Sequence, residues 1–165
     1  MKKLNQYIQE KLIINKDYSD GKMYHPKSFD ELRKIIEDRY DKLGAGTKRN
    51  PIDFNDIDVS NLDSFCNDED EGIFLGTKFK YIDISLWDVS KVKSMYAMFF
   101  ACKKLESVGD LSKWDVSSVT DMSFMFYKCK NFNQDISNWN VSNVRNNNYM
   151  FDNCPIKSEY KPKFK

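Results

Sequence analysis

The side chains in this sequence that could do chemistry are four cysteines, a single histidine and a dense run of carboxylates. Cys102, Cys129 and Cys154 are separated by 27 and 25 residues, and Cys66 lies outside that spacing. Structural zinc sites need cysteines in close pairs such as CxxC, and the sequence contains no such pair. Side chains that recur at equivalent positions of stacked repeats point inward, so the spacing favours a row of buried, reduced thiols.

Carboxylates concentrate in residues 53–71, "DFNDIDVSNLDSFCNDEDE", which carry eight acidic and no basic side chains. The stretch "DFNDID" resembles a calcium loop, but Ile57 stands where the fifth-position ligand oxygen is required, and the loop glycine is missing. Two interpretations stay open for the consecutive acids near the end of the block: a solvated loop, or an electronegative patch that faces a basic partner. These acids are Asp68, Glu69, Asp70 and Glu71.

Other catalytic and nucleotide-binding patterns are missing from the sequence. A Ser–His or Cys–His nucleophile would depend on His25, the only histidine, and no motif surrounds it. The sequence has neither GxxxxGK[ST] nor GxGxxG. A net charge of +1 and a pI of about 7.6 leave no basic stripe of the kind that nucleic-acid binding requires. We therefore expect no enzyme activity, no cofactor, no metal and no direct binding of nucleic acid.

The cysteine spacing belongs to a longer internal repeat that three tryptophans align. Trp87, Trp114 and Trp139 are each followed by valine at the second and fifth positions, by Met-Phe at the eleventh and twelfth, and by cysteine at the fifteenth. Four residues before each tryptophan is an aspartate of the kind that fixes a backbone turn, namely Asp83, Asp110 and Asp135. A degenerate copy, "IDVSNLDSF", precedes these repeats, and the last copy decays at Asn147 and Pro155. Decay at both ends is typical of a stacked array.

Each repeat can be interpreted locally. Trp-x-Val has the two-residue period of a short strand with both side chains on one face, which we expect to form the core. Seven positions after each tryptophan stands a residue that favours a helix N-cap, namely Ser94, Asp121 and Asn146. Met122, Met125 and Phe126 then follow the spacing of one face of a short helix. One short strand and one short helix in every ~25 residues predict an α+β fold, a short solenoid of leucine-rich-repeat type.

The stretch "WDVSSVTDMSFMFYKCKNFNQDIS" resembles the repeat of BspA-like bacterial surface proteins, a divergent leucine-rich-repeat family. The resemblance covers residues 80–154 well and residues 52–79 weakly. It implies a solenoid that binds other macromolecules, commonly on a cell surface. This sequence has no secretion signal or lipid-attachment cysteine near its start and no apolar stretch of ~18 residues, so we expect a cytoplasmic protein without a membrane segment. Short proteins of this kind resemble those of bacterial mobile elements and phages.

Residues 1–50 are predicted to form a helical N-terminal cap, either as a cover for the first repeat or as a partner-binding element of their own. An amphipathic stripe is formed by Leu4, Tyr7, Ile8 and Leu12. A second helix starts at a capping box of Ser28 and Glu31 and ends at Gly44 or Gly46. Its inward face is expected to consist of Leu32, Ile35, Ile36, Arg39 and Leu43. About four solenoid repeats then occupy residues 51–154, and residues 155–165 form a basic C-terminal tail.

Because each tryptophan shares strand parity with a valine, side chains of the opposite parity are expected on the exposed face of the sheet. With the acids of residues 68–71, this row is the candidate partner-binding surface: Leu86, Asp88, Lys113, Asp115, Asn138 and Asn140. The resulting hypothesis is a non-enzymatic module that binds a protein partner by surface recognition. Two alternatives stay open: an intracellular phage or mobile-element inhibitor whose acidic surface blocks a host defence nuclease, and a cell-surface adhesin-type protein.

Overall fold

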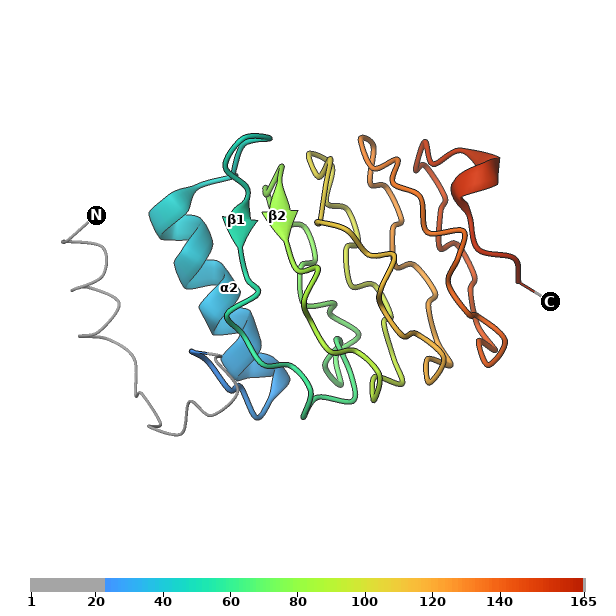
Figure 1. Ribbon diagram of the computed structural model, residues 1–165, viewed down its shortest axis with the longest axis horizontal. Coiled ribbons are helices and arrows are strands. Elements are labelled where there is room, and N and C mark those ends of the chain that lie inside the picture. The colour runs from blue at the N-terminus through green and yellow to red at the C-terminus, as the bar shows by residue number, and fades with distance from the viewer. Residues whose placement is uncertain (1–22, 165) are drawn as a thin grey trace.

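A computed structural model describes residues 23–164 (Figure 1). In chain order its elements are α2 (Phe29–Leu43), β1 (Ile52–Asp53), β2 (Ile82–Asp83) and the 3-10 helix η1 (Ser158–Tyr160). The fold is therefore mixed helix and strand, with most of the described residues in turns, bends and irregular structure. Figure 1 shows α2 at one end and the C-terminal residues at the other, with the intervening chain laid down in sequence order. The helix expected around Leu4 and Leu12 falls outside the described residues.

The start of α2 is set by the predicted cap. The Ser28 Oγ accepts the backbone N–H of Glu31 at 3.2 Å. The Glu31 carboxylate accepts the N–H of Lys27 at 2.8 Å, so the reciprocal half of the capping box is shifted by one residue. At the other end, Gly44 adopts a φ of 72°, and its N–H donates to the Tyr40 carbonyl at 2.8 Å. Glycine takes this left-handed conformation without the steric penalty of a Cβ.

One face of α2 is packed against the core. Leu32 and Ile36 are fully buried there, and Ile35 is partly buried. Leu43, which the sequence pattern placed on the inward face, is 46% exposed because it is the last residue of the helix and lies at the edge of the packed region. None of the helices in residues 23–164 is long and apolar enough to cross a membrane.

The three tryptophans of the sequence repeat lie in the core, as predicted. Trp87, Trp114 and Trp139 are 3%, 5% and 4% exposed. A buried indole needs a hydrogen-bond acceptor, and each Nε1 donates to a backbone carbonyl of the preceding repeat. The acceptors, in the same order, are Phe54 at 2.8 Å, Ile84 at 3.3 Å and Leu111 at 3.1 Å. The same side chains therefore fill the core and tie each repeat to the one before it.

The prediction of a short helix after each N-cap residue is wrong. Residues 94–102, 121–129 and 146–154, called the turn segments below, form consecutive turns instead. Each contains two left-handed non-glycine residues four positions apart, with φ between 49° and 59°: Ala97, Ala101, Phe124, Lys128, Tyr149 and Asn153. A right-handed helix cannot contain such residues. The misleading residues are Ser94, Asp121 and Asn146, whose side chains accept the N–H two residues on and so start a turn rather than a helix.

Backbone N–H groups in the turn segments alternate between two kinds of partner. Within residues 94–102, alternate N–H groups close turns by donating to the carbonyl three residues earlier. The others donate to the next turn segment at 2.8–3.0 Å: Met95 to Asp121, Ala97 to Ser123, Phe99 to Met125 and Ala101 to Tyr127. Residues 122–128 bind residues 146–152 in the same way. The turn segments therefore stack side by side, connected by hydrogen bonds at every second residue.

The predicted strand at each Trp-x-Val is also misplaced. Within residues 23–164 the strands are β1 and β2, which pair in parallel with Ile52 opposite Ile82. The Trp-x-Val stretches are irregular and each follows directly on a turn: the Trp87 N–H donates to the Ile84 carbonyl at 3.1 Å rather than to a neighbouring strand. The aspartates before the tryptophans fix these turns, as predicted. Asp83, Asp110 and Asp135 each accept the N–H of the serine two residues on at 2.9–3.0 Å.

Candidate protein-binding surface

The six side chains predicted to form an exposed row are all exposed, Leu86 by 64%. Leu86, Lys113 and Asn138 lie in turns, the other three lie in the irregular stretches that follow, and none of the six lies on a strand. Three of them, Asp88, Asp115 and Asn140, accept the N–H of the serine two residues on at 3.0–3.3 Å. Hydrogen bonds from Ser117 hold the pKa of Asp115 below its usual range. Much of the row's polar capacity is thus used within the chain.

The two remaining polar members of the row differ. The Asn138 Nδ2 donates to the Ser112 carbonyl at 2.7 Å, which again serves the fold. Lys113 is exposed. The side chains of the row that the fold leaves available for a partner are therefore chiefly Leu86 and Lys113.

Residues 67–71 form a loop that interrupts the first, degenerate repeat and is called the acidic loop below. Its four acidic residues, 68–71, are exposed. Asn67 shapes the loop, because its Oδ1 accepts the N–H groups of Glu69 at 3.1 Å and Glu71 at 2.8 Å. The chain rejoins the stack at Gly72, where a Cβ would lie 2.0 Å from the Ala97 carbonyl oxygen. This close approach requires glycine, and it places the acidic loop beside the turn segment 94–102.

The outer side of the turn segments carries aromatic side chains that sequence reasoning did not select. Tyr96, Phe100, Phe124, Tyr127 and Tyr149 form a continuous cluster, called the aromatic strip below. Tyr149 stacks on Phe124 and Tyr127 stacks on Phe100, with ring centroids 5.0 and 4.9 Å apart. An edge contact between Phe124 and Tyr127 at 5.6 Å joins the two pairs, and a second edge contact of Phe124, at 5.8 Å, adds Tyr96. Four of the rings are partly buried, and Tyr149 is 57% exposed.

The aromatic residues of the strip recur at fixed positions of the sequence repeat, so the repeat alignment could have identified them. Phe124 and Tyr149 stand ten positions after their tryptophans, and Phe100 and Tyr127 stand thirteen positions after theirs. On the assumed helix these positions would have been scattered solvent-facing residues. In the observed stack, equivalent positions lie one above the other, so the same residues come into ring contact.

The acidic loop adjoins one end of the aromatic strip. Burial raises the pKa of the Tyr96 hydroxyl, and the carboxylates of Asp70 and Asp121 raise it further. Further along the strip, the Lys128 Nζ lies 4.8 Å from the centre of the Tyr127 ring, a cation–π geometry. The surface therefore combines aromatic area with negative charge at one end and a cation paired with an aromatic face.

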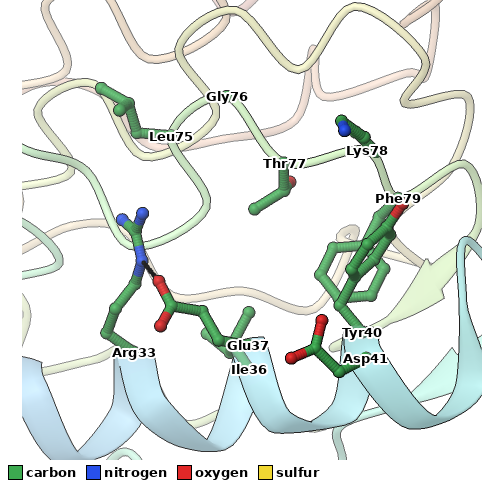
Figure 2. A pocket seen from close by; sticks show the side chains of 10 residues that line it. All are labelled: Arg33, Ile36, Glu37, Tyr40, Asp41, Leu75, Gly76, Thr77, Lys78 and Phe79. Carbon is green, nitrogen blue, oxygen red and sulfur yellow. Dashed lines mark hydrogen bonds and ion pairs between the residues drawn. The ribbon is translucent and has the colours of Figure 1, made fainter.

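A pocket of about 230 Å³ opens between α2 and residues 75–79 (Figure 2). Figure 2 shows Arg33 and Glu37 joined on one side and Tyr40 beside Phe79 on the other. The Arg33 Nε lies 2.8 Å from the Glu37 Oε1, and the Tyr40 and Phe79 rings meet edge to face at 5.1 Å. Gly76, part of the pocket wall, donates its N–H to the Phe100 carbonyl at 2.8 Å. The pocket wall is thus hydrogen-bonded to the turn segment that carries Phe100.

The side chains that could be chemically reactive, the cysteines and the histidine, take part in packing and hydrogen bonding instead. Cys102 and Cys129 are buried, Cys66 and Cys154 are partly buried, and all four are free thiols. The Sγ atoms of Cys102 and Cys129 each donate to a backbone carbonyl at 2.9 Å. The neighbouring Cys102 side chain and burial raise the pKa of Cys129. His25 Nδ1 lies 3.1 Å from Asp58, and the described residues contain no group of three or more His, Cys, Asp or Glu placed to hold a metal.

The fold and this surface define a mixed helix-and-strand protein whose hydrogen bonds and core contacts recur every 25–27 residues of the sequence repeat. Residues 48–161 match the family described as Mycoplasma protein of unknown function, DUF285, and the chain belongs to this family. Membership supports a relation to BspA-like repeats, while the leucine-rich-repeat motif itself stays a prediction. No curated protein and no solved structure gives a significant match.

Proposed function

We propose that the chain is a non-enzymatic protein-binding module, a short solenoid that recognises its partner through the aromatic strip and the acidic loop. The observation that carries the proposal is the continuous ring contact from Tyr96 through Phe124 to Tyr149 on the outer side of stacked turn segments. Aromatic side chains are enriched in protein interfaces because they supply a large contact area at a low cost in conformational entropy. The membership of a repeat-containing family is compatible with this role.

The rigidity of the surface supports the same function. The rings from Tyr96 to Tyr127 are attached to turn segments whose N–H groups bind the next turn segment at 2.8–3.0 Å, and the segment that carries Tyr149 accepts the N–H groups of residues 122–128. Residues that are held in place before binding lose little conformational freedom in the complex, which strengthens binding. An enzyme would instead need converging polar groups in a cleft, whereas in the pocket beside α2 Arg33 is paired with Glu37 and Tyr40 packs on Phe79.

The charge of the surface indicates which side chains a partner should present. The acidic loop presents four exposed carboxylates next to Tyr96, at one end of the strip. We expect the partner to place an apolar or arginine side chain on the rings and a basic group near the acidic loop. No contact among the described residues favours the narrower role of nuclease inhibitor over that of adhesin.

The test is site-specific photo-crosslinking. A photoreactive phenylalanine analogue replaces Tyr149 on the aromatic strip or, as a matched control, the similarly exposed Leu86 outside the strip. Irradiation in a bacterial lysate should give a discrete cross-linked protein from position 149 and none from position 86. The Phe124→Ser variant, which interrupts the strip, should remove the cross-link. A partner that cross-links from position 86 alone would refute the aromatic strip as the binding surface.

A further inference from the structure

The last turn segment ends in an unusual edge. Every carbonyl from Asn146 to Asp152 accepts a backbone N–H: those at even positions from residues 122–128, and those at odd positions within the segment itself. The N–H groups at odd positions in this segment have no acceptor among residues 23–164. These are the N–H groups of Asn147, Tyr149, Phe151 and Asn153. The edge therefore presents four donors at two-residue spacing and no free acceptor between them.

The direction of these donors follows from the preceding segments. Their counterparts in residues 121–129 are the N–H groups of Met122, Phe124, Phe126 and Lys128, which bind carbonyls of the next segment at 2.8–3.0 Å. By the same backbone geometry, the donors at the edge point along the stack, away from residues 121–129. They stand where a further turn segment would be bound.

We propose that this donor edge binds a segment of a partner protein that has the same turn conformation and presents carbonyls at every second residue. An ordinary β-strand edge presents an N–H and a C=O on each outward-facing residue. Against a donor-only edge, half of the groups of such a strand would be left unpaired, at a cost for each group. A turn segment like residues 121–129 matches fully, because its carbonyls at odd positions bind the preceding segment, and its N–H groups at even positions bind the following one.

The occupant is not a second copy of this chain. Two copies cannot pair edge to edge, because both edges would offer donors only. Head-to-tail stacking would require the free opposite end of another copy, and that end is covered by α2, whose Arg33 Nη1 donates to the Gly72 carbonyl at 3.0 Å. The donor edge therefore resists self-association, in the way that natural sheet edges are protected against aggregation, while staying open to a partner with matching acceptors.

Residues 155–164 close the same end of the core without closing the donor edge. The Tyr160 carbonyl accepts the Ile136 N–H at 3.0 Å, and Ile156 and Pro162 are buried. The Lys161 Nζ lies 5.3 Å from the centre of the Phe151 ring. These contacts involve side chains and the stretch around Ile136, and none of them engages the four N–H groups. The chain thus covers its apolar end and leaves one polar edge.

The test uses the full-length protein and a synthetic probe. The probe is an acetylated and amidated peptide with the sequence of residues 119–131 and serine in place of Cys129, since this stretch already supplies four matching carbonyls within the fold. Backbone amide exchange is followed by NMR. Without the peptide, the amides of Tyr149 and Phe151 should exchange at least tenfold faster than those of Phe124 and Phe126. With the peptide they should slow down, while the other amides stay unchanged.

Two variants of the protein provide the matched control. Asn147→Pro removes one edge donor. The residue before a proline favours the β region of the backbone, and Asn146 forms a parallel β-bridge with Asp121, so the substitution should be tolerated there. Asn148→Ala alters the neighbouring residue but removes no edge donor. Loss of one hydrogen bond should weaken peptide binding by about three- to tenfold in the first variant only.

Three results would overturn the inference. One is slow exchange of the Tyr149 and Phe151 amides in the free protein, which would mean that the edge is already covered. Another is protection that grows with protein concentration in the absence of peptide, which would assign the edge to a second copy. The third is a peptide that fails to protect these amides or does not distinguish Asn147→Pro from Asn148→Ala. None of these readouts depends on the aromatic rings, so the proposed function is tested separately.

Discussion

The backbone N–H of Ala97 donates to the carbonyl of Ser123, a residue one repeat later, at 3.0 Å. In an α-helix the same N–H would bind the carbonyl four residues earlier. This hydrogen bond distinguishes the two structures in which the Met-x-x-Met-Phe spacing could bury its apolar side chains, a helix and a stack of turns. The chain buries them by stacking turns on turns, so the stability of each turn segment depends on its neighbour in the stack.

Replacing Ala101 by glycine distinguishes the observed turns from a helix. Ala101 has a φ of 57°, a left-handed conformation that costs an L-residue ~1–2 kcal/mol and costs glycine almost nothing. We expect Ala101→Gly to raise the free energy of unfolding by roughly 0.5–1 kcal/mol, after the greater entropy of glycine in the unfolded chain is subtracted. In a helix interior the same change would lower stability by ~1 kcal/mol. Urea denaturation followed by circular dichroism measures the sign.

Ala101→Val is the companion variant for this prediction. A β-branched side chain fits the left-handed region least well, so this variant should be less stable than the wild type. If Val proved neutral and Gly destabilising, the left-handed turn at Ala101 would be wrong.

Removing one indole N–H tests the ties between repeats. The Trp87 Nε1 donates to the Phe54 carbonyl at 2.8 Å, and the side chain is 3% exposed. We expect Trp87→Phe to lower the free energy of unfolding by about 1–3 kcal/mol, from the lost hydrogen bond and the volume left empty. Leu86→Ala at the neighbouring residue is the control, because its side chain is 64% exposed and should change stability by less than ~0.5 kcal/mol. Equal losses in the two variants would contradict the packing described for Trp87.

The core was predictable from the sequence because burial depends mainly on side-chain type and on repeat register. Trp87, Trp114 and Trp139 recur with their valines at fixed offsets, and stacking of equivalent positions buries them whatever the local backbone conformation. The cap of α2 was predictable for a different reason, since Ser28 and Gly44 act through local hydrogen bonds that need no tertiary context.

The backbone of the turn segments was not predictable by the same reasoning. The i, i+3, i+4 spacing of Met122, Met125 and Phe126 is compatible with a helix, and Asp121 is as good at starting a turn as at capping a helix. The deciding contribution comes from hydrogen bonds to residues 146–152, which are distant in sequence. Because the aromatic strip depends on that stacking, it was missed together with the turns. The proposed partner-binding role of the exposed row at Leu86 and Asp88 stays a prediction.

Acid should destabilise the fold through Asp83. Burial alone would raise the pKa of this carboxyl group, but the hydrogen bonds from Ser85 outweigh it, and the net pKa lies below the usual value. A carboxylate with a lowered pKa contributes stability above its unfolded pKa of ~3.9, and the contribution is lost as the pH falls through the folded value. The free energy of unfolding should therefore fall below about pH 4.

The matched variant for the acid prediction is Asp83→Asn, which keeps an Oδ1 acceptor for the turn but cannot be protonated in this range. Chemical denaturation at pH 7, 5 and 3 should show a smaller loss of stability between pH 5 and 3 in the variant than in the wild type. An identical acid dependence of the two proteins would rule Asp83 out as a source of the effect.

Thiol labelling should separate the four cysteines by burial. Cys102 and Cys129 are 0% exposed, and the Cys102 side chain together with burial raises the pKa of Cys129, so that it stays a protonated, unreactive thiol. Burial also raises the pKa of Cys154. In the native protein, iodoacetamide should label Cys66 first, and Cys129 should stay unlabelled even when the pH is raised to about 8.5, the ordinary thiol pKa.

Peptide mapping by mass spectrometry gives the order of labelling. Labelling in 8 M urea, where all four cysteines should react at similar rates, is the control. If native Cys129 were alkylated as fast as Cys66, the thiols would not lie in the packed core between turn segments, and the stacking of residues 94–102 on residues 121–129 would have to be revised.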